Sequence, residues 1–195
     1  MSTRLPAARR RRQLLEVALR VFADQGFHVT SMSDIADAAG VTKPVLYQHF
    51  ASKRELYGQI LSEVGNQLQE TIVKAVASAS TPREMVERGF AAYFHYVDNH
   101  RDAFRIFYAS GSWRDEEFSR IVHDVENALA EQVAGLIEIE GLSADQRRLL
   151  GHGIVGMIEG ASTHWMSSPA SADPDELTRQ LADLAWRGLR GVRVN

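Results

Sequence analysis

The 195-residue chain contains no cysteine, so it has neither a disulfide framework nor a thiol nucleophile. No apolar run approaches the ~18 residues that indicate a membrane span. The first residues also lack the continuous apolar core of a signal peptide. From these absences we expect a cytoplasmic protein that makes no use of the membrane.

Motifs of common catalytic sites are missing as well. The chain contains no GxSxG elbow, Walker loop or HExxH sequence. Gly151, Gly153 and Gly156 do spell GxGxxG, the dinucleotide-binding pattern. They lie inside a segment with helical periodicity, however, where the phosphate-binding turn after a strand cannot form. We therefore expect no enzyme and no cofactor.

The acidic residues and histidines give only weak indications of a metal site. Seven histidines are scattered along the chain, and Asp98 near His95 and His100 is the one grouping that leaves such a site open. Surface or core positions explain the histidines more simply, and we predict no metal. Residues 115 to 117 are three consecutive acids, which we interpret as an exposed turn.

Residues 30 to 53 contain two short helical patterns separated by Gly40. The first pattern has apolar residues at the i, i+3, i+4, i+7 spacing of a buried helical face, namely Met32, Ile35, Ala36 and Ala39. Ser31 and Asp34 have the spacing of a capping box at its start. Gly40 is typical of a helix end, because glycine adopts the left-handed conformation at little steric cost.

The second pattern runs from about residue 43 to 50. Thr42 is a candidate cap, and Pro44 fits the first turn because the amide that it lacks would have no intrahelical partner. If Val45, Leu46 and Phe50 face inward, the outward residues are Lys43, Pro44, Tyr47, Gln48 and His49. Such side chains contact phosphates and base edges. The pattern predicts a helix-turn-helix; the alternative is an ordinary helical hairpin with a solvated face.

Charge is unevenly distributed along the chain. Residues 1 to 54 hold nine Lys or Arg against four Asp or Glu, a net of +5, whereas the remainder holds thirteen against twenty-one, a net of −8. A basic run near the N-terminus, ahead of a helical pattern, contains Arg4, Arg9, Arg10, Arg11 and Arg12. We interpret it as an arm for phosphates or the minor groove, although such runs are often only solvated tails.

The segment ADQGFHVTSMSDIADAAGVTKPVLYQHFASKRELY resembles the DNA-binding domain of the TetR family of transcriptional regulators over roughly residues 10 to 57. The residues that carry the resemblance, in order and without gaps, are Gly26, Phe27, Thr30, Ile35, Ala36, Ala39, Gly40, Val41, Leu46, Tyr47, Phe50, Lys53 and Leu56. The resemblance implies DNA contacts from Thr30, Ser31, Thr42, Lys43, Pro44, Tyr47, His49 and Lys53. Many family members carry glycine where this chain has Pro44, so base readout there is expected to differ.

Beyond residue 55 the pattern remains helical, and no alternating segment indicates a strand. We expect an all-α chain with an N-terminal helix-turn-helix domain over residues 1 to 55, the motif itself lying near 31 to 50. A C-terminal helical ligand-binding and dimerisation domain follows over residues 56 to 195. Helix starts are predicted from cap patterns at Ser52 with Glu55, Thr81 with Glu84, Ser143 with Gln146, and Asp173 with Glu176.

The resemblance implies that the C-terminal domain binds a small-molecule effector. Candidate pocket residues are Tyr93, Phe94, Phe107, Tyr108, Trp113, Met157 and Trp165. Any one of them is better explained as ordinary core, since aromatic residues at helical spacing usually pack, and the prediction is of the pocket as a whole rather than of its individual walls.

The last two expected helices are candidates for a homodimer interface. Small residues recur in the penultimate helix at Gly151, Gly153, Gly156, Gly160 and Ala161. The resemblance implies dimerisation through these helices, and a repressor released from a palindromic operator by an unknown small molecule. A non-specific architectural DNA-binding protein is the alternative in another class.

Overall fold

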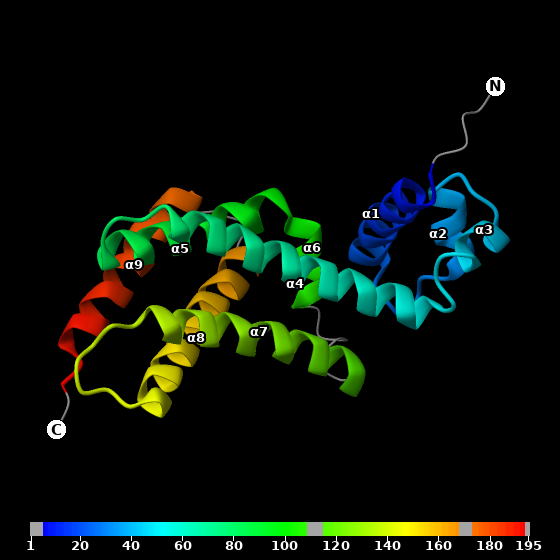
Figure 1. The fold of residues 1–195 in the computed structure, drawn as a ribbon. Coiled ribbons are helices and arrows are strands. Elements are labelled where there is room, and N and C mark those ends of the chain that lie inside the picture. Colours follow the sequence, from blue (N-terminus) through cyan, green and yellow to red (C-terminus); the bar gives the residue numbers. More distant parts are fainter. Residues whose placement is uncertain (1–5, 109–114, 168–172, 194–195) are drawn as a thin grey trace. The chain divides into compact units, whose positions relative to one another are not determined.

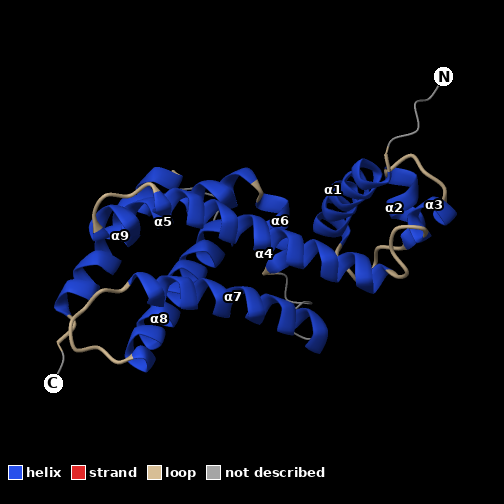
Figure 2. Cartoon of the chain, viewed as in Figure 1, coloured by secondary structure: helices blue, strands red, loops and turns tan. Residues whose placement is uncertain are grey.

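The computed structural model describes residues 6–108, 115–167 and 173–193, and within these ranges the chain forms helices and no strands (Figure 2). This confirms the all-α prediction. The helices are α1 (Ala7–Gln25), α2 (Met32–Ala38), α3 (Lys43–Tyr47), α4 (Lys53–Ala77), α5 (Pro82–Asn99), α6 (Arg101–Phe107), α7 (Glu116–Leu136), α8 (Ala144–Ser167) and α9 (Pro174–Gly191) (Figure 1). In the described part of the chain, no helix has both the length and the apolar character that crossing a bilayer requires.

The chain forms two compact units. The first comprises Met1–Val64 and Asp102–Val122, and the second comprises Gly65–Arg101 and His123–Asn195. Helices α4 and α7 therefore contribute to both. The expected domain boundary after residue 55 falls inside α4, and the first unit includes a later segment that the sequence pattern assigned to the C-terminal domain.

The first unit is organised around an aromatic cluster. The ring of Phe27 lies 4.8 Å from that of Tyr57 and 5.0 Å from that of Phe118, and the Tyr57 and Phe118 rings are 4.7 Å apart. Each such pair stabilises the fold by about 0.5–1.5 kcal/mol beyond the burial of its surface. Phe118, from the start of α7, is thus part of the core that supports the helix-turn-helix.

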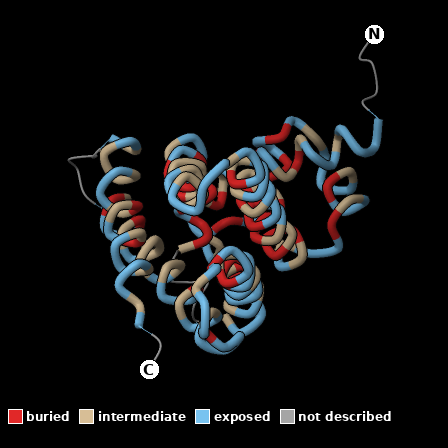
Figure 3. Tube along the Cα trace, turned by 60° about the vertical axis from the view of Figure 1, so that its left-hand side comes forward, coloured by how far each residue is buried: buried red, intermediate tan, exposed pale blue. Residues whose placement is uncertain are grey.

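The second unit packs α5 against α9 and α8. Phe94 of α5 lies 6.1 Å from Trp165 of α8 in an edge-to-face arrangement. Gly151 allows α8 to approach α7 closely, because a Cβ at that position would lie 2.3 Å from the carbonyl oxygen of Ala130. Figure 3 shows the buried positions recurring on one side of the helices, as amphipathic periodicity requires.

Several helices begin at the predicted caps. The side-chain oxygens of Ser52, Thr81, Ser143 and Asp173 each accept a hydrogen bond from a backbone N–H two or three residues later. Helix α7 is the long helix that precedes the cap at Ser143. Trp113 lies outside the described residues, and α7 ends at Leu136, where a short-range turn follows.

Candidate nucleic-acid interface

The predicted capping box starts α2. Ser31 Oγ accepts from the backbone N–H of Asp34 at 3.2 Å, and Asp34 Oδ2 accepts from the backbone N–H of Ser31 at 2.8 Å. The hydrogen bonds from Ser31 hold the pKa of the Asp34 carboxyl below its usual value. Both hydrogen bonds join residues that are three positions apart in the sequence, which is why the spacing alone predicted them.

The turn after α2 also forms as predicted. Gly40 has φ +63°, the left-handed conformation that favours glycine. Val41 N–H donates to the Ala36 carbonyl at 3.0 Å, and Gly40 N–H donates to the Asp37 carbonyl at 3.1 Å. These bonds satisfy carbonyls that the end of α2 would otherwise leave free, and they fix the direction in which the chain enters α3.

Helix α3 is held in place by two buried side chains, Leu46 within the helix and Phe50 just after it. It is shorter than predicted: regular helix ends at Tyr47, and His49 N–H donates to the Leu46 carbonyl in a tighter turn. Thr42 occupies the N-cap position, but its hydroxyl makes no capping hydrogen bond. Leu46 and Phe50 are buried as predicted, whereas Val45, expected to face inward, and His49, expected to face outward, are both half-buried.

The outward face of this segment presents a concentrated set of hydrogen-bonding groups. Lys43, Pro44 and Gln48 are exposed, Tyr47 is 49% exposed, and His49 is half-buried. Thr42 is exposed beside them. A cation, a phenol, an amide and a hydroxyl on a helix held rigidly by its buried side are suited to phosphates and base edges.

Thr30 does not lie where a DNA contact requires it. The residue is only 1% exposed, and its hydroxyl donates to the Gly26 carbonyl at 2.8 Å. Its side chain thus holds the connection between α1 and α2. Neighbouring Ser31 is exposed and remains compatible with the predicted phosphate contact.

Lys53, for which the resemblance implies a DNA contact, has its ammonium group engaged within the protein. Its Nζ donates to the carbonyls of Phe27 and Thr30, each at 2.7 Å, and lies 4.5 Å from the centroid of the Phe27 ring. The ammonium group is therefore engaged by the loop that precedes α2. It stabilises the position of the helix-turn-helix from within the protein.

The basic run near the N-terminus is helical rather than an extended arm. Residues 9–12 belong to α1, whereas Arg4 lies outside the described residues. The guanidinium of Arg11 hydrogen-bonds Gln59 and lies 5.2 Å from the centroid of the Phe50 ring. This arginine thus links α1 and α4 beside the residue that anchors α3.

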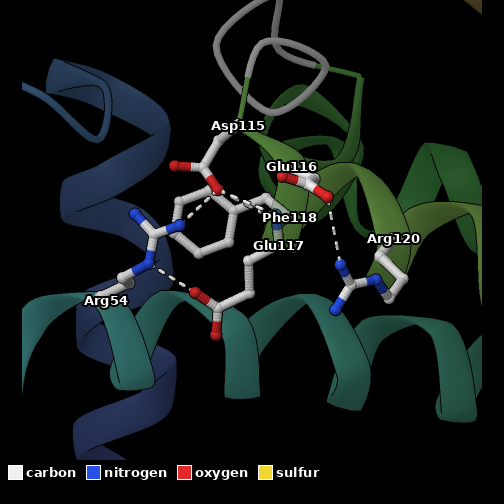
Figure 4. Close-up of polar contacts among 6 residues, drawn as sticks. All are labelled: Arg54, Asp115, Glu116, Glu117, Phe118 and Arg120. Carbon is white, nitrogen blue, oxygen red and sulfur yellow. Dashed lines mark hydrogen bonds and ion pairs between the residues drawn. The ribbon is translucent and has the colours of Figure 1, made fainter.

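Sequence inspection missed a contact made by Arg54, the second residue of α4 (Figure 4). Its Nη2 lies 2.5 Å from Asp115 Oδ1, its Nε hydrogen-bonds Glu117, and its guanidinium carbon is 4.8 Å from the centroid of the Phe118 ring. The hydrogen bond from Arg54 lowers the pKa of the Asp115 carboxyl. The acids at residues 115 to 117 are therefore not simply a solvated turn.

Two family models together match most of the chain. The one described as "Bacterial regulatory proteins, tetR family" matches residues 14–60, and "Tetracyclin repressor-like, C-terminal domain" matches residues 82–188. The chain belongs to the TetR family. The helix-turn-helix of α2 and α3 is thus the DNA-binding element of a TetR-family transcriptional regulator.

Relatives support this TetR-family assignment along nearly the whole chain. The transcriptional activator FasR of Mycolicibacterium smegmatis is 32% identical over 97% of this chain and 87% of its own length. The transcriptional repressor KstR2 of Rhodococcus jostii is 34% identical over 94% of this chain and 80% of its own. A crystal structure of a TetR-like regulator from Rhodococcus sp. RHA1 superposes with a TM-score of 0.80, at 31% identity, over 97% of this chain and 100% of that one.

The candidate effector residues of this TetR-family chain are divided between the two units. Tyr93, Phe94 and Trp165 are buried in the second unit, and Met157 is half-buried there. The ring of Phe94 contacts those of both Tyr93 and Trp165. Phe107 and Tyr108 belong to the first unit, and Trp113 lies outside the described residues.

The two histidines and the aspartate that were considered as a metal site each contact another partner. His95 Nε2 lies 2.9 Å from Asp175 Oδ1, and His100 Nδ1 lies 2.9 Å from the Tyr96 carbonyl. Asp98 pairs with Arg101. Within the residues that the structure describes, no three histidine or acidic side chains are grouped so that they could hold a metal ion.

The small-residue face of α8 is partly internal. Gly151 is buried against α7, so it is not available to a second chain. Gly153, Gly156 and Gly160 are exposed, and a Cβ at any of them would meet nothing within 4 Å. Two large apolar side chains are also exposed: Leu149 on α8 at 72% and Leu184 on α9 at 58%.

Proposed function

We propose that the protein is a homodimeric repressor that binds a palindromic operator and is released from it by a small-molecule effector. The observation that carries this proposal is the outward face of α3, where Lys43, Tyr47 and Gln48 are exposed above the buried anchors Leu46 and Phe50. Thr42, Pro44, His49 and Ser31 complete the proposed contact surface. Thr30 and Lys53 act on it indirectly, by fixing the loop before α2.

Dimerisation through α8 and α9 supplies the second recognition helix. Exposed glycines on α8 permit close helix approach, and Leu149 and Leu184 are apolar side chains that a second copy would cover. Two copies related by a twofold axis present paired recognition helices to successive major grooves, about 34–36 Å apart on a palindromic site. Such a regulator works in the cytoplasm, where the DNA is.

The effector is proposed to bind among the aromatic residues of the C-terminal domain. Tyr93, Phe94, Met157 and Trp165 supply apolar and aromatic surface in one unit. An effector that binds better to the dimer conformation unfit for the operator must weaken operator affinity reciprocally. Repression is proposed over activation because occupancy of an operator is sufficient for it; among the similar proteins, that of Rhodococcus jostii is described as a repressor and that of Mycolicibacterium smegmatis as an activator.

Selection of bound sequences from random duplex DNA at physiological salt tests this proposal. The expected result is a palindromic consensus that binds at least ~10³-fold more tightly than a scrambled duplex of the same composition. Binding without a consensus, and with steep salt dependence, would instead support a non-specific architectural protein. A consensus without twofold symmetry would overturn the proposal that a dimer binds a palindromic operator.

A further inference from the structure

Three consecutive side chains at the start of α4 each hold a different part of the first unit. Lys53 Nζ donates to two carbonyls in the loop before α2. Glu55 Oε2 accepts from the backbone N–H of Ala51, in the connection between α3 and α4, at 2.7 Å. Arg54, which lies between them in the sequence, reaches the start of α7. Successive side chains of a helix point about 100° apart, so one turn of α4 contacts three separate elements.

Helix α3 is tied to this turn of α4 by a short connection. Only residues 48–52 separate the end of α3 from the start of α4. The backbone N–H of Phe50, a buried residue, donates to the Leu46 carbonyl at 3.1 Å. The backbone N–H of Glu55 donates to Ser52 Oγ at 3.0 Å. Because α3 is attached in this way, its orientation follows that of the first turn of α4.

The guanidinium of Arg54 contacts three side chains at the start of α7 (Figure 4). Its Nη2 lies 2.5 Å from Asp115 Oδ1, its Nε hydrogen-bonds Glu117, and its carbon lies 4.8 Å from the centroid of the Phe118 ring. Asp115 Oδ1 also accepts from the backbone N–H of Glu117 at 3.1 Å, so this carboxylate is fixed to the end of the helix. An isolated exposed ion pair contributes little, whereas a guanidinium bound by two carboxylates and a ring is held in one direction.

Helices α4 and α7 remain close one turn further along. Gly58 follows Arg54 by one turn, and Ile121 follows Glu117 by one turn. A Cβ at Gly58 would lie 3.3 Å from Cδ1 of Ile121, so the absence of a side chain there lets the two helices approach. The helices therefore meet in a fixed register, in which the charged contact at one turn and the apolar contact at the next reinforce each other.

We propose that Arg54 is a positioning residue for operator binding: its contact with Asp115 and Glu117 holds the first turn of α4, and with it α3, in the orientation that fits the major groove. Arg54 itself does not touch the DNA, because its guanidinium stays engaged by α7. When the contact is lost, α3 samples orientations that do not fit, and the apparent affinity falls with the fraction of molecules that remain competent. This inference rests on the proposed function, since it concerns the same DNA-binding face.

Exchange of the two charges tests the proposal, by anisotropy titration of the duplex that the wild-type protein selects. Arg54→Glu places a third carboxylate beside Asp115 and Glu117 and should weaken operator binding at least ~10-fold. Glu117→Arg should weaken it several-fold. The double variant restores an ion pair in the reverse sense and should return the affinity to within about threefold of the wild type. A double variant as weak as Arg54→Glu would overturn the proposal, since an arginine that grips phosphate directly cannot be replaced from α7.

Salt dependence separates positioning from a direct phosphate contact. Loss of one phosphate contact reduces the slope of log affinity against log salt by about one. Arg54→Met keeps the length of the side chain and its packing on Phe118, and it should weaken binding with the wild-type slope. Arg120→Met is the matched control, because Arg120 is an exposed arginine that pairs with Glu116 along α7 itself, and it should bind as the wild type does (Figure 4). A slope reduced by about one in Arg54→Met alone would overturn the proposal.

Hydrogen exchange on the protein alone keeps this inference apart from the proposed function. Backbone amides of residues 42–50 should exchange at least about threefold faster in Arg54→Met than in Arg120→Met. If the wild type selects a DNA sequence and Arg54→Met binds it equally well, the inference is refuted and the proposed function stands. If the wild type selects no sequence, the proposed function is refuted and hydrogen exchange decides the role of Arg54. Faster exchange then retains Arg54 as the residue that orders α3, and unchanged exchange refutes it. Arg54→Met also gives the comparison if Arg54→Glu fails to fold.

Discussion

Lys43 and Lys53 show how two similar residues acquire different roles through their surroundings. Lys43 is exposed at the start of α3, whereas the ammonium of Lys53 is engaged by the carbonyls of Phe27 and Thr30. The family resemblance implied DNA contacts from both lysines. The carbonyl partners of Lys53 lie 23 and 26 residues earlier in the chain, a distance at which no local spacing rule predicts a contact.

We expect Lys53→Met to destabilise the first unit by about 1–3 kcal/mol, because backbone carbonyls that are partly buried lose their donor. The methionine retains the length of the side chain and its contact with the Phe27 ring. Urea unfolding measures the change. Lys43→Met is the matched control, and its free energy of unfolding should stay within about 0.5 kcal/mol of the wild type. An unchanged stability in Lys53→Met would show that the ammonium is not structural.

At the level of helices, the features predicted correctly were those with local causes. Capping patterns at Ser31, Ser52 and Ser143 depend on residues three positions apart, and the structure contains the expected hydrogen bonds. Contacts between distant elements were not predictable. The exposed or buried state of each glycine in α8 is set by its neighbours on α7, so composition alone could not separate Gly151 from Gly153.

Gly151→Ala is expected to destabilise the protein by about 1–3 kcal/mol or more, because its Cβ would lie 2.3 Å from a backbone oxygen that cannot easily move. Gly135→Ala, on the facing helix α7, is the control. A Cβ there meets nothing within 4 Å, and alanine should stabilise the helix by up to about 1 kcal/mol. Thermal unfolding of the two variants should therefore shift in opposite directions. A shift of the same sign in both would contradict the proposed close approach of α7 and α8.

The contact of Arg54 with Asp115 and Glu117 is expected to depend on pH (Figure 4). The folded pKa of Asp115 is lowered below its ordinary value of 3.8, so the contact contributes its full stability above that value. The contribution is lost as the pH falls through the lowered folded pKa. Arg54→Ala should consequently lower the melting temperature at pH 7, and this difference should shrink toward pH 2. A difference that is constant across this range would assign the effect to packing on Phe118.

For the whole molecule, the sequence predicted the position of the helix-turn-helix better than the organisation of the rest. The DNA-binding motif is specified by short-range signals such as Gly40 and the apolar residues of α2. The first unit, however, also includes residues from Asp102 to Val122, which join it through Phe118 and Arg54. The predicted effector residues are likewise shared between the units, because periodicity identifies a buried face without identifying its partner.

The central claim is that the protein binds its operator as a dimer and contacts the DNA through the exposed face of α3. Anisotropy titration of the selected duplex with wild-type protein, Tyr47→Ala and Lys43→Ala tests it most directly, with light scattering on the same samples. Lys74→Ala removes an exposed cation of the second unit and serves as the control. We expect each α3 variant to lose at least ~10-fold in operator affinity while remaining a folded dimer, and the control to bind as the wild type does. Unchanged affinity in both α3 variants, or loss of the dimer in either, would contradict the account.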